Sequence, residues 1–110
     1  MYKGINVPSD HANIITSILK LLPLKSHVWV FGSRLKPTIK PFADLDLAID
    51  CNQKPLSFAL MADLRRAFEE SSLPYKVDIV DMNTINSDFL NIINQNKVPW
   101  DFNINLTTDK

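Results

Sequence analysis

The sequence predicts an α/β fold in which a small β-sheet packs against helices. Three short runs rich in aliphatic and aromatic residues have the character of strands, and three longer segments repeat apolar residues at helical spacing. The two kinds of segment alternate along the chain, although this pattern leaves the strand directions open. At 110 residues the chain is large enough for one hydrophobic core, so we expect a single domain over residues 1–110.

The first expected element is a helix that begins after Pro8, is capped by Ser9 or Asp10 and ends at Pro23. Its apolar stripe repeats at helical spacing and consists of Ile14, Ile15, Ile18, Leu19 and Leu22. The first strand follows at residues 28–31, which form a short apolar run before a glycine.

The second strand is expected within residues 44–50. Because side chains alternate along a strand, Asp44 and Asp46 fall on one face and the leucine and isoleucine side chains fall on the other. Between the first two strands, Pro37 and Pro41 keep any helix very short, so this connection is expected to be mainly loop.

The second helix is expected after a turn at residues 52–55 and ends at residues 71–74, which contain two serines and a proline. Its inner face is formed by Leu60, Met61, Leu64, Ala67 and Phe68. The third strand covers residues 75–80 and again alternates. A last helix is capped by Asn83 or Thr84, and its apolar residues are Ile85, Phe89, Leu90, Ile92 and Ile93.

The C-terminal residues are polar apart from a few apolar side chains that include Trp100 and Phe102. These aromatic side chains either fold back onto the domain, which we favour, or anchor a partner interface. We expect the folded core to span about residues 9–100, with residues 101–110 as a tail.

Candidate site residues lie at the ends of the first two strands. Two carboxylates that lean the same way, Asp44 and Asp46, repel each other unless a cation lies between them, and hard oxygen ligands suit Mg²⁺. Gly32 lets the backbone approach a ligand closely, and the following amides and the Ser33 hydroxyl can contact phosphate oxygens. A phosphate site beside metal carboxylates indicates phosphoryl or nucleotidyl transfer.

Composition limits the other possibilities. Twelve basic residues balance twelve acidic ones, which disfavours extended nucleic-acid binding. The single cysteine, Cys51, excludes an internal disulfide framework and is typical of a reducing compartment. The N-terminus lacks the pattern of a signal peptide, and no apolar run approaches the roughly 20 residues of a membrane helix. We therefore expect a cytoplasmic protein without a membrane partner.

A Gly-Ser pair at residues 32–33, ten intervening residues, Asp44-x-Asp46 and a further strand with Asp78 together resemble the nucleotidyltransferase superfamily of polymerase-beta type. The similarity covers roughly residues 9–100. The small size and the sequences GSRLKPTIKPFADLDLAID and YKVDIVD resemble more narrowly the minimal nucleotidyltransferases, the MNT antitoxins encoded beside HEPN toxins in prokaryotes. This resemblance implies a mixed sheet with helices packed on it.

The resemblance also implies roles for single residues. Gly32 and Ser33 would hold the triphosphate of ATP, and Asp44, Asp46 and Asp78 would bind Mg²⁺, in a site of two metal ions. Such enzymes transfer AMP from ATP to a hydroxyl, reportedly of a tyrosine of the partner HEPN toxin, and thereby silence it. For Asp78, both a general base and a ligand of the metal at the nucleophile remain open.

Further basic residues and one further aspartate are candidates for this site. Arg34 is included among the nucleotide-binding residues, and Lys36 and Lys40 are weaker candidates for neutralising phosphates. Asp81 competes with Asp78 for the third carboxylate, but its place at the end of a strand is more typical of a turn or a helix cap.

Two other functions remain open. The chain could be a non-catalytic antitoxin that neutralises its partner by occlusion, because Pro37 and Ala43 depart from the family pattern near the nucleotide site. It could also modify a small molecule, as aminoglycoside-modifying nucleotidyltransferases do, although the chain has no room for the second domain that those enzymes use.

Overall fold

A computed structural model describes residues 4–101, which form a mixed four-stranded sheet of order β3-β2-β1-β4. The strands are β1 (Ser26–Phe31), β2 (Leu45–Cys51), β3 (Val77–Asp81) and β4 (Val98–Trp100). β1 runs antiparallel to both β2 and β4, whereas β2 runs parallel to β3. The expected α/β fold with a mixed sheet is confirmed.

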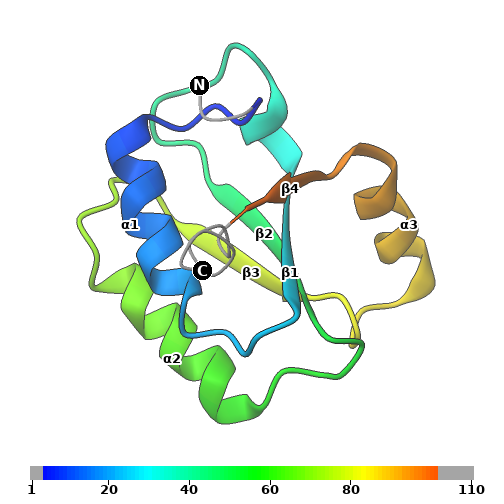
Figure 1. Cartoon of the computed structure of the whole chain (residues 1–110). Helices are drawn as coiled ribbons and strands as arrows, with labels where there is room; N and C mark the ends of the chain where they lie inside the picture. The colour runs from blue at the N-terminus through cyan, green and yellow to red at the C-terminus, as the bar shows by residue number, and fades with distance from the viewer. Residues whose placement is uncertain (1–3, 102–110) are drawn as a thin grey trace, which may run out of the picture.

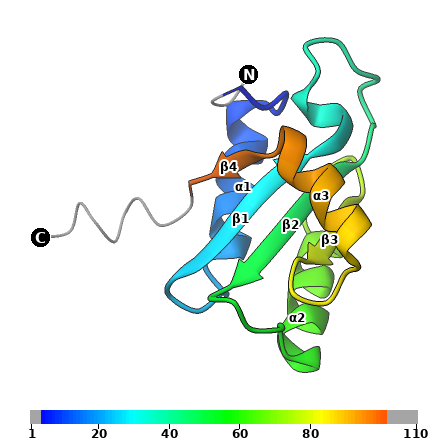
Figure 2. The same cartoon turned by 90° about the vertical axis from the view of Figure 1, so that its right-hand side faces the viewer.

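Helices cover both faces of this sheet. α1 (Ser9–Leu19) and α2 (Phe58–Glu69) lie together on one face, and α3 (Ser87–Asn96) lies on the other (Figure 1). The view turned by 90° places α3 in front of the sheet, with α1 and α2 behind it (Figure 2). A single 3₁₀ turn, η1 (Gly32–Leu35), follows β1, so the expectation of a very short helix before Pro37 is confirmed. Within residues 4–101, none of the helices has the length and apolar character needed to span a bilayer.

The hydrophobic core lies between the sheet and the α1–α2 layer. Alternation along β1 and β2 buries every second residue against these helices, namely Val28, Val30, Leu45, Leu47 and Ile49. The helices contribute Ile15 and Leu19 from α1 and Leu64 and Phe68 from α2 to the same cluster. The intervening residues of the strands, including Asp46, therefore face the side on which α3 lies.

Some helix boundaries differ from the prediction. α1 begins directly after Pro8 without a side-chain cap, and it ends at Leu19, before Pro23 is reached. The cap of α3 is Asn86, whose side chain accepts a hydrogen bond of 2.8 Å from the Phe89 amide. The cap predicted from Ser9 or Asp10 is wrong, because both residues lie inside α1. The cap predicted from Asn83 or Thr84 is also wrong, because residues 82–84 form a turn that continues from β3.

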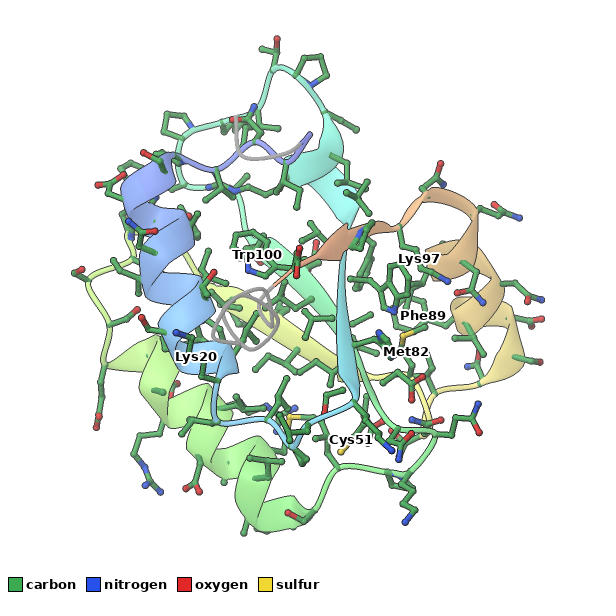
Figure 3. The ribbon with its side chains drawn as sticks, viewed as in Figure 1. Lys20, Cys51, Met82, Phe89, Lys97 and Trp100 are labelled. Carbon is green, nitrogen blue, oxygen red and sulfur yellow. The ribbon has the colours of Figure 1, made fainter. Side chains whose placement is uncertain are left out.

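β4 was not predicted, although the proposal that Trp100 folds back is confirmed. Trp100 is 2% exposed, and its Nε1 donates a hydrogen bond of 3.1 Å to Oγ1 of Thr16 in α1. Figure 3 shows its side chain inside the molecule, on the α1 side of the sheet, while Phe89 and Lys97 lie on the α3 side. Phe102 lies outside the described residues.

Candidate active site

Two of the predicted carboxylates lie side by side near the first residues of the neighbouring strands β2 and β3. Asp46 of β2 is the register partner of Asp78 on the parallel strand β3, and on its other side it pairs with Phe31, the last residue of β1. Side chains of register partners lie on the same face of a sheet. The sequence pattern placed Asp46 and Asp78 on strands, and the parallel pairing of β2 and β3 brings them together.

Gly32 follows Phe31 and lies directly against Asp46. Its φ of +82° is in the left-handed region that side chains disfavour, and a Cβ built there would collide with Oδ2 of Asp46. Glycine is therefore required at this position for two reasons: the backbone turn into η1 and the space occupied by the carboxylate. The close approach predicted for the Gly32 backbone was to a ligand, whereas the contact seen in the structure is with the Asp46 carboxylate.

The electrostatics of the site are unfavourable for a second negative charge. Burial first, and then the neighbouring carboxylates of Asp78 and Asp44, together raise the pKa of the half-buried Asp46 carboxyl from 3.8 to about 6. Lys76 offsets part of the charge, because its Nζ lies 3.3 Å from Oδ1 of Asp78. Both of these side chains are partly exposed, so this ion pair is a weak one.

Asp44 is placed less closely than the other two carboxylates. It lies one residue before β2 and is exposed to solvent. Within residues 4–101, no group of three His, Cys, Asp or Glu side chains is assembled so that it could hold a metal ion. The predicted trio of Asp44, Asp46 and Asp78 is thus represented by one adjacent pair and one exposed neighbour.

The donor set nevertheless fits a hard divalent cation. Asp46 and Asp78 offer only carboxylate oxygens, which are the ligands that Mg²⁺ takes in proteins. Burial and, after it, the neighbouring carboxylates raise the pKa of Asp46, and a cation bound there would stabilise its ionised form. An exposed Asp44 can supply a further oxygen at the same edge of the sheet.

The buried position of Arg34 does not suit a direct contact with phosphate. Its side chain is 3% exposed, and the guanidinium donates to the backbone carbonyls of Asn6, Pro41 and Ala43 at distances of 2.8–3.1 Å. The same group stacks 3.8 Å above the centre of the Tyr75 ring. The guanidinium thus ties the loop before Asp44 to the rest of the molecule, so the direct phosphate contact predicted for Arg34 does not follow from this arrangement.

Three further candidate residues lie within η1 or in the loop that follows it. Ser33 is half-buried in the 3₁₀ turn directly after Gly32, and Lys36 is exposed beside the same turn. Lys40 is exposed in the loop that leads toward Asp44. Of these three residues, Lys36 lines the hollow described next.

A hollow of about 710 Å³ opens between η1 and α3, next to Gly32. Phe31 and Phe89 meet edge to face in its wall, with ring centres 6.0 Å apart. Lys36 of the loop and Ile92 of α3, which is 60% exposed, also line it. The sequence did not predict the contact between Phe31 and Phe89, because it forms only when α3 packs against this side of the sheet.

Two further aspartates have structural roles. Asp81 is 6% exposed and accepts hydrogen bonds of 2.7 and 2.9 Å from the amides of Leu56 and Asn83, as expected for a residue that begins a turn. Asp50 accepts from the Gln53 amide at 2.7 Å and from the Asn83 side chain at 3.0 Å. The carboxylates of Asp81 and Asp50 are thus both engaged in hydrogen bonds within the fold.

Comparison with known proteins points to one family. The family model described as polymerase beta, nucleotidyltransferase matches residues 13–101. A curated relative, the probable protein adenylyltransferase MntA of Haemophilus influenzae, is 41% identical over 92 residues, which cover 84% of this chain and 80% of the relative.

Two solved structures share the fold. A crystal structure of a toxin–antitoxin with AMP-PNP superposes with a TM-score of 0.67 at 19% identity, covering 88% of this chain and 84% of the other. A mutant of the toxin–antitoxin MntA–HpeT superposes with a TM-score of 0.64 at 16% identity and the same coverage.

Proposed function

The chain belongs to the polymerase beta nucleotidyltransferase family, and from this premise we propose that it transfers AMP from ATP to a hydroxyl group of a toxin protein and thereby neutralises it. The observation that carries the proposal is the pairing of Asp46 with Asp78 beside Gly32. Similarity to the probable protein adenylyltransferase of Haemophilus influenzae supports a protein acceptor. The resemblance to MNT antitoxins assigns the acceptor more narrowly to a tyrosine of a HEPN toxin.

The reaction exchanges one bond to phosphorus for another. The acceptor oxygen attacks the α-phosphorus of ATP, a new oxygen–phosphorus bond forms, and the bond from the α-phosphorus to the bridging oxygen breaks. AMP remains on the acceptor and pyrophosphate leaves. The proton of the acceptor hydroxyl passes to the carboxylate of Asp78, whose side chain is 40% exposed and thus within reach of a second protein.

The three aspartates also form the proposed metal site. Asp44, Asp46 and Asp78 would hold two Mg²⁺ ions, and these ions would supply positive charge that favours the attacking oxygen and neutralises the triphosphate. The raised pKa of Asp46 supports this assignment, because burial and the neighbouring carboxylates disfavour its charge and a bound cation would offset that cost.

The nucleotide is assigned to the surface around η1. The amides that follow Gly32 and the hydroxyl of Ser33 contact the triphosphate, and Lys36 supplies a nearby positive charge. The hollow beside Phe31 and Phe89 takes the remainder of the nucleotide, since its volume of about 710 Å³ lies in the range of small-molecule sites.

One observation favours a second function. Asp44 is exposed, and the described residues contain no preassembled group of three metal-binding side chains. An antitoxin that only occludes its toxin would need no such group. This alternative predicts that neutralisation survives the loss of the carboxylates.

The experiment is intact-mass analysis of the protein encoded next to this one after incubation with the chain, ATP and Mg²⁺. A gain of AMP units with the wild type, and none with the Asp44→Asn/Asp46→Asn double variant, is the expected result. Asp50→Asn is the matched control, because Asp50 lies on the same strand and face but outside the proposed site. Undiminished transfer by the double variant would refute the assignment, and a stable complex without any mass change would favour occlusion.

A further inference from the structure

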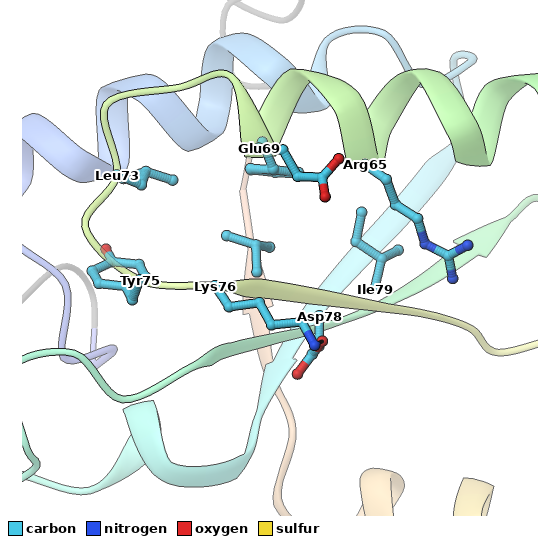
Figure 4. A pocket seen from close by; sticks show the side chains of 9 residues that line it. Arg65, Glu69, Leu73, Tyr75, Lys76, Asp78 and Ile79 are labelled. Carbon is cyan, nitrogen blue, oxygen red and sulfur yellow. Dashed lines mark ion pairs between the residues drawn. The ribbon is translucent and has the colours of Figure 1, made fainter.

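A groove of about 580 Å³ runs between α2 and β3, beside Asp78 (Figure 4). Apolar side chains form its floor: Phe68, Leu73, Val77 and Ile79. Its rim is charged and consists of Arg65 and Glu69 from α2 and of Lys76, the residue directly before β3. Asp78 lines this groove and also belongs to the proposed catalytic group, whereas Gly32, Asp44 and Asp46 do not line it. The groove is therefore a separate surface that adjoins the site at one residue.

The outer edge of β3 is open along this groove. Among residues 4–101, β3 pairs with β2 alone, and the bonds at the ends of that pair use the Lys76 carbonyl and the Met82 amide. A parallel ladder uses every second residue of a strand, so the amide and carbonyl groups of Val77 and Ile79 point to the open edge. An open edge of this kind can accept an extended segment of another protein.

Side-chain alternation on β3 links the groove to the site. Val77 and Ile79 line the groove and pack with the core, and Asp78, between them in the strand, has its side chain on the opposite face. Figure 4 shows Ile79 directed toward α2 and Asp78 directed away from it. A segment added beside β3 would alternate in the same way. A residue whose hydroxyl lies on the Asp78 side would then be flanked by two residues whose side chains enter the apolar groove.

The charged residues on the rim of the groove indicate which kind of side chain a bound segment should carry. Arg65 and Lys76 outnumber Glu69 by one charge, and Lys76 is already engaged 3.3 Å from Asp78. Arg65 makes no ion pair among residues 4–101, whereas its neighbour Arg66 lies 3.7 Å from Asp63. Arg65 is therefore the cation on this rim that is available to an acidic side chain of a bound segment.

We propose that the acceptor segment of the partner protein binds as an extended strand along the outer edge of β3. Apolar side chains on both sides of the acceptor residue enter the groove, an acidic side chain contacts Arg65, and the acceptor hydroxyl lies at Asp78. This inference rests on the proposed function, because it assigns a position to the hydroxyl that receives AMP.

Kinetics with two groove variants test the proposal. Arg65→Glu reverses the charge of the rim, and Val77→Pro removes an outward amide that no bond within the sheet requires, which an edge strand tolerates. We expect each to raise the KM for the partner protein by about three- to tenfold, as for the loss of one ion pair or one hydrogen bond, with the kcat at saturating partner and the affinity for ATP unchanged. Arg66→Glu, one residue along α2 and outside the groove, is the matched control and should leave the KM unchanged.

Amide hydrogen exchange supplies a second, direct readout. In the free chain the amides of Val77 and Ile79 should exchange rapidly, and in the complex with the partner they should become protected at least tenfold. Protection of the same amides at rising concentration of the chain alone would show that a second copy occupies the edge, and would overturn the proposal.

The possible failures are distinguishable. If the wild type transfers no AMP to the partner, the proposed function fails and this inference fails with it. If the wild type transfers AMP while Arg65→Glu and a folded Val77→Pro retain its KM, or while Val77 and Ile79 stay unprotected in the complex, the proposed function stands and the docking site is wrong.

Discussion

Replacing Asp46 by asparagine should stabilise the fold above pH 6 while it abolishes AMP transfer. Folding raises the pKa of this carboxyl from 3.8 to about 6, because burial and the charges of Asp78 and Asp44 disfavour the ionised form. A group of this kind contributes its full stability below pH 3.8 and loses that contribution as the pH rises through about 6. At neutral pH the ionised Asp46 therefore costs free energy that an uncharged asparagine of the same size does not.

The size of the effect follows from the pKa. A rise from 3.8 to about 6 corresponds to roughly 3 kcal/mol at 1.36 kcal/mol per pKa unit. Asp46 is only half-buried, so water screens part of this cost, and we expect a gain of about 1 kcal/mol in the free energy of unfolding at pH 7.5. At pH 4 the folded wild type is protonated at this position, so most of the gain should be lost.

Urea unfolding followed by tryptophan fluorescence measures this difference, with a chelator present at both pH values. Asp50→Asn is the control: its carboxylate accepts two hydrogen bonds, so its replacement should not stabilise the fold at either pH. A gain for Asp46→Asn that persists at pH 4, or no gain at pH 7.5, would refute the electrostatic reasoning. Adding Mg²⁺ should then stabilise the wild type more than the variant, because the cation binds the ionised carboxylates.

Two further substitutions test the arrangement around the site. Gly32→Ala should cost about 2–4 kcal/mol in urea unfolding and abolish transfer, because it adds a collision with Asp46 to the strain of a positive φ; Gly4→Ala, with a φ of +85° and open space around it, should cost only about 1 kcal/mol, and equal costs would exclude the collision. Arg34→Met should cost about 3 kcal/mol of stability because it leaves buried carbonyls without donors, while the affinity of the folded variant for ATP falls less than threefold; a larger loss of affinity in a protein of unchanged stability would restore the phosphate-binding role predicted from the sequence.

Local sequence patterns predicted most of the fold. The apolar stripe of α2, with Leu64 and Phe68 buried, and the alternation that separates Asp46 from Leu45 and Leu47 are properties of neighbouring residues, so spacing alone reveals them. β4 escaped prediction because it has only three residues and includes Pro99, so its existence depends on pairing with a strand far away in the sequence. No pattern within residues 98–100 encodes that pairing.

The site was predictable to the extent that it depends on strands. The sequence placed Asp46 and Asp78 on strands, but their adjacency required the parallel pairing of β2 and β3, which the pattern left open. The burial of Arg34 was also beyond reach, because it arises from carbonyls contributed by two separate segments, the N-terminal residues and the loop before Asp44. The same residue type in an exposed turn would be free to contact phosphate.

The late position of β4 in the sequence has a consequence for synthesis. The bond between Trp100 and Thr16 joins residues 84 apart, and β1 has no partner on that side until β4 has been made. At about 5–20 residues per second, the ribosome takes roughly 5–20 s to reach residue 100. From the synthesis of β1 until β4 has been made, the nascent chain exposes this edge of β1, and Thr16 in α1 lacks its hydrogen bond from the indole of Trp100. The sheet is therefore complete only after residue 100 has been synthesised, and a partner that recognises the complete sheet must bind after that point.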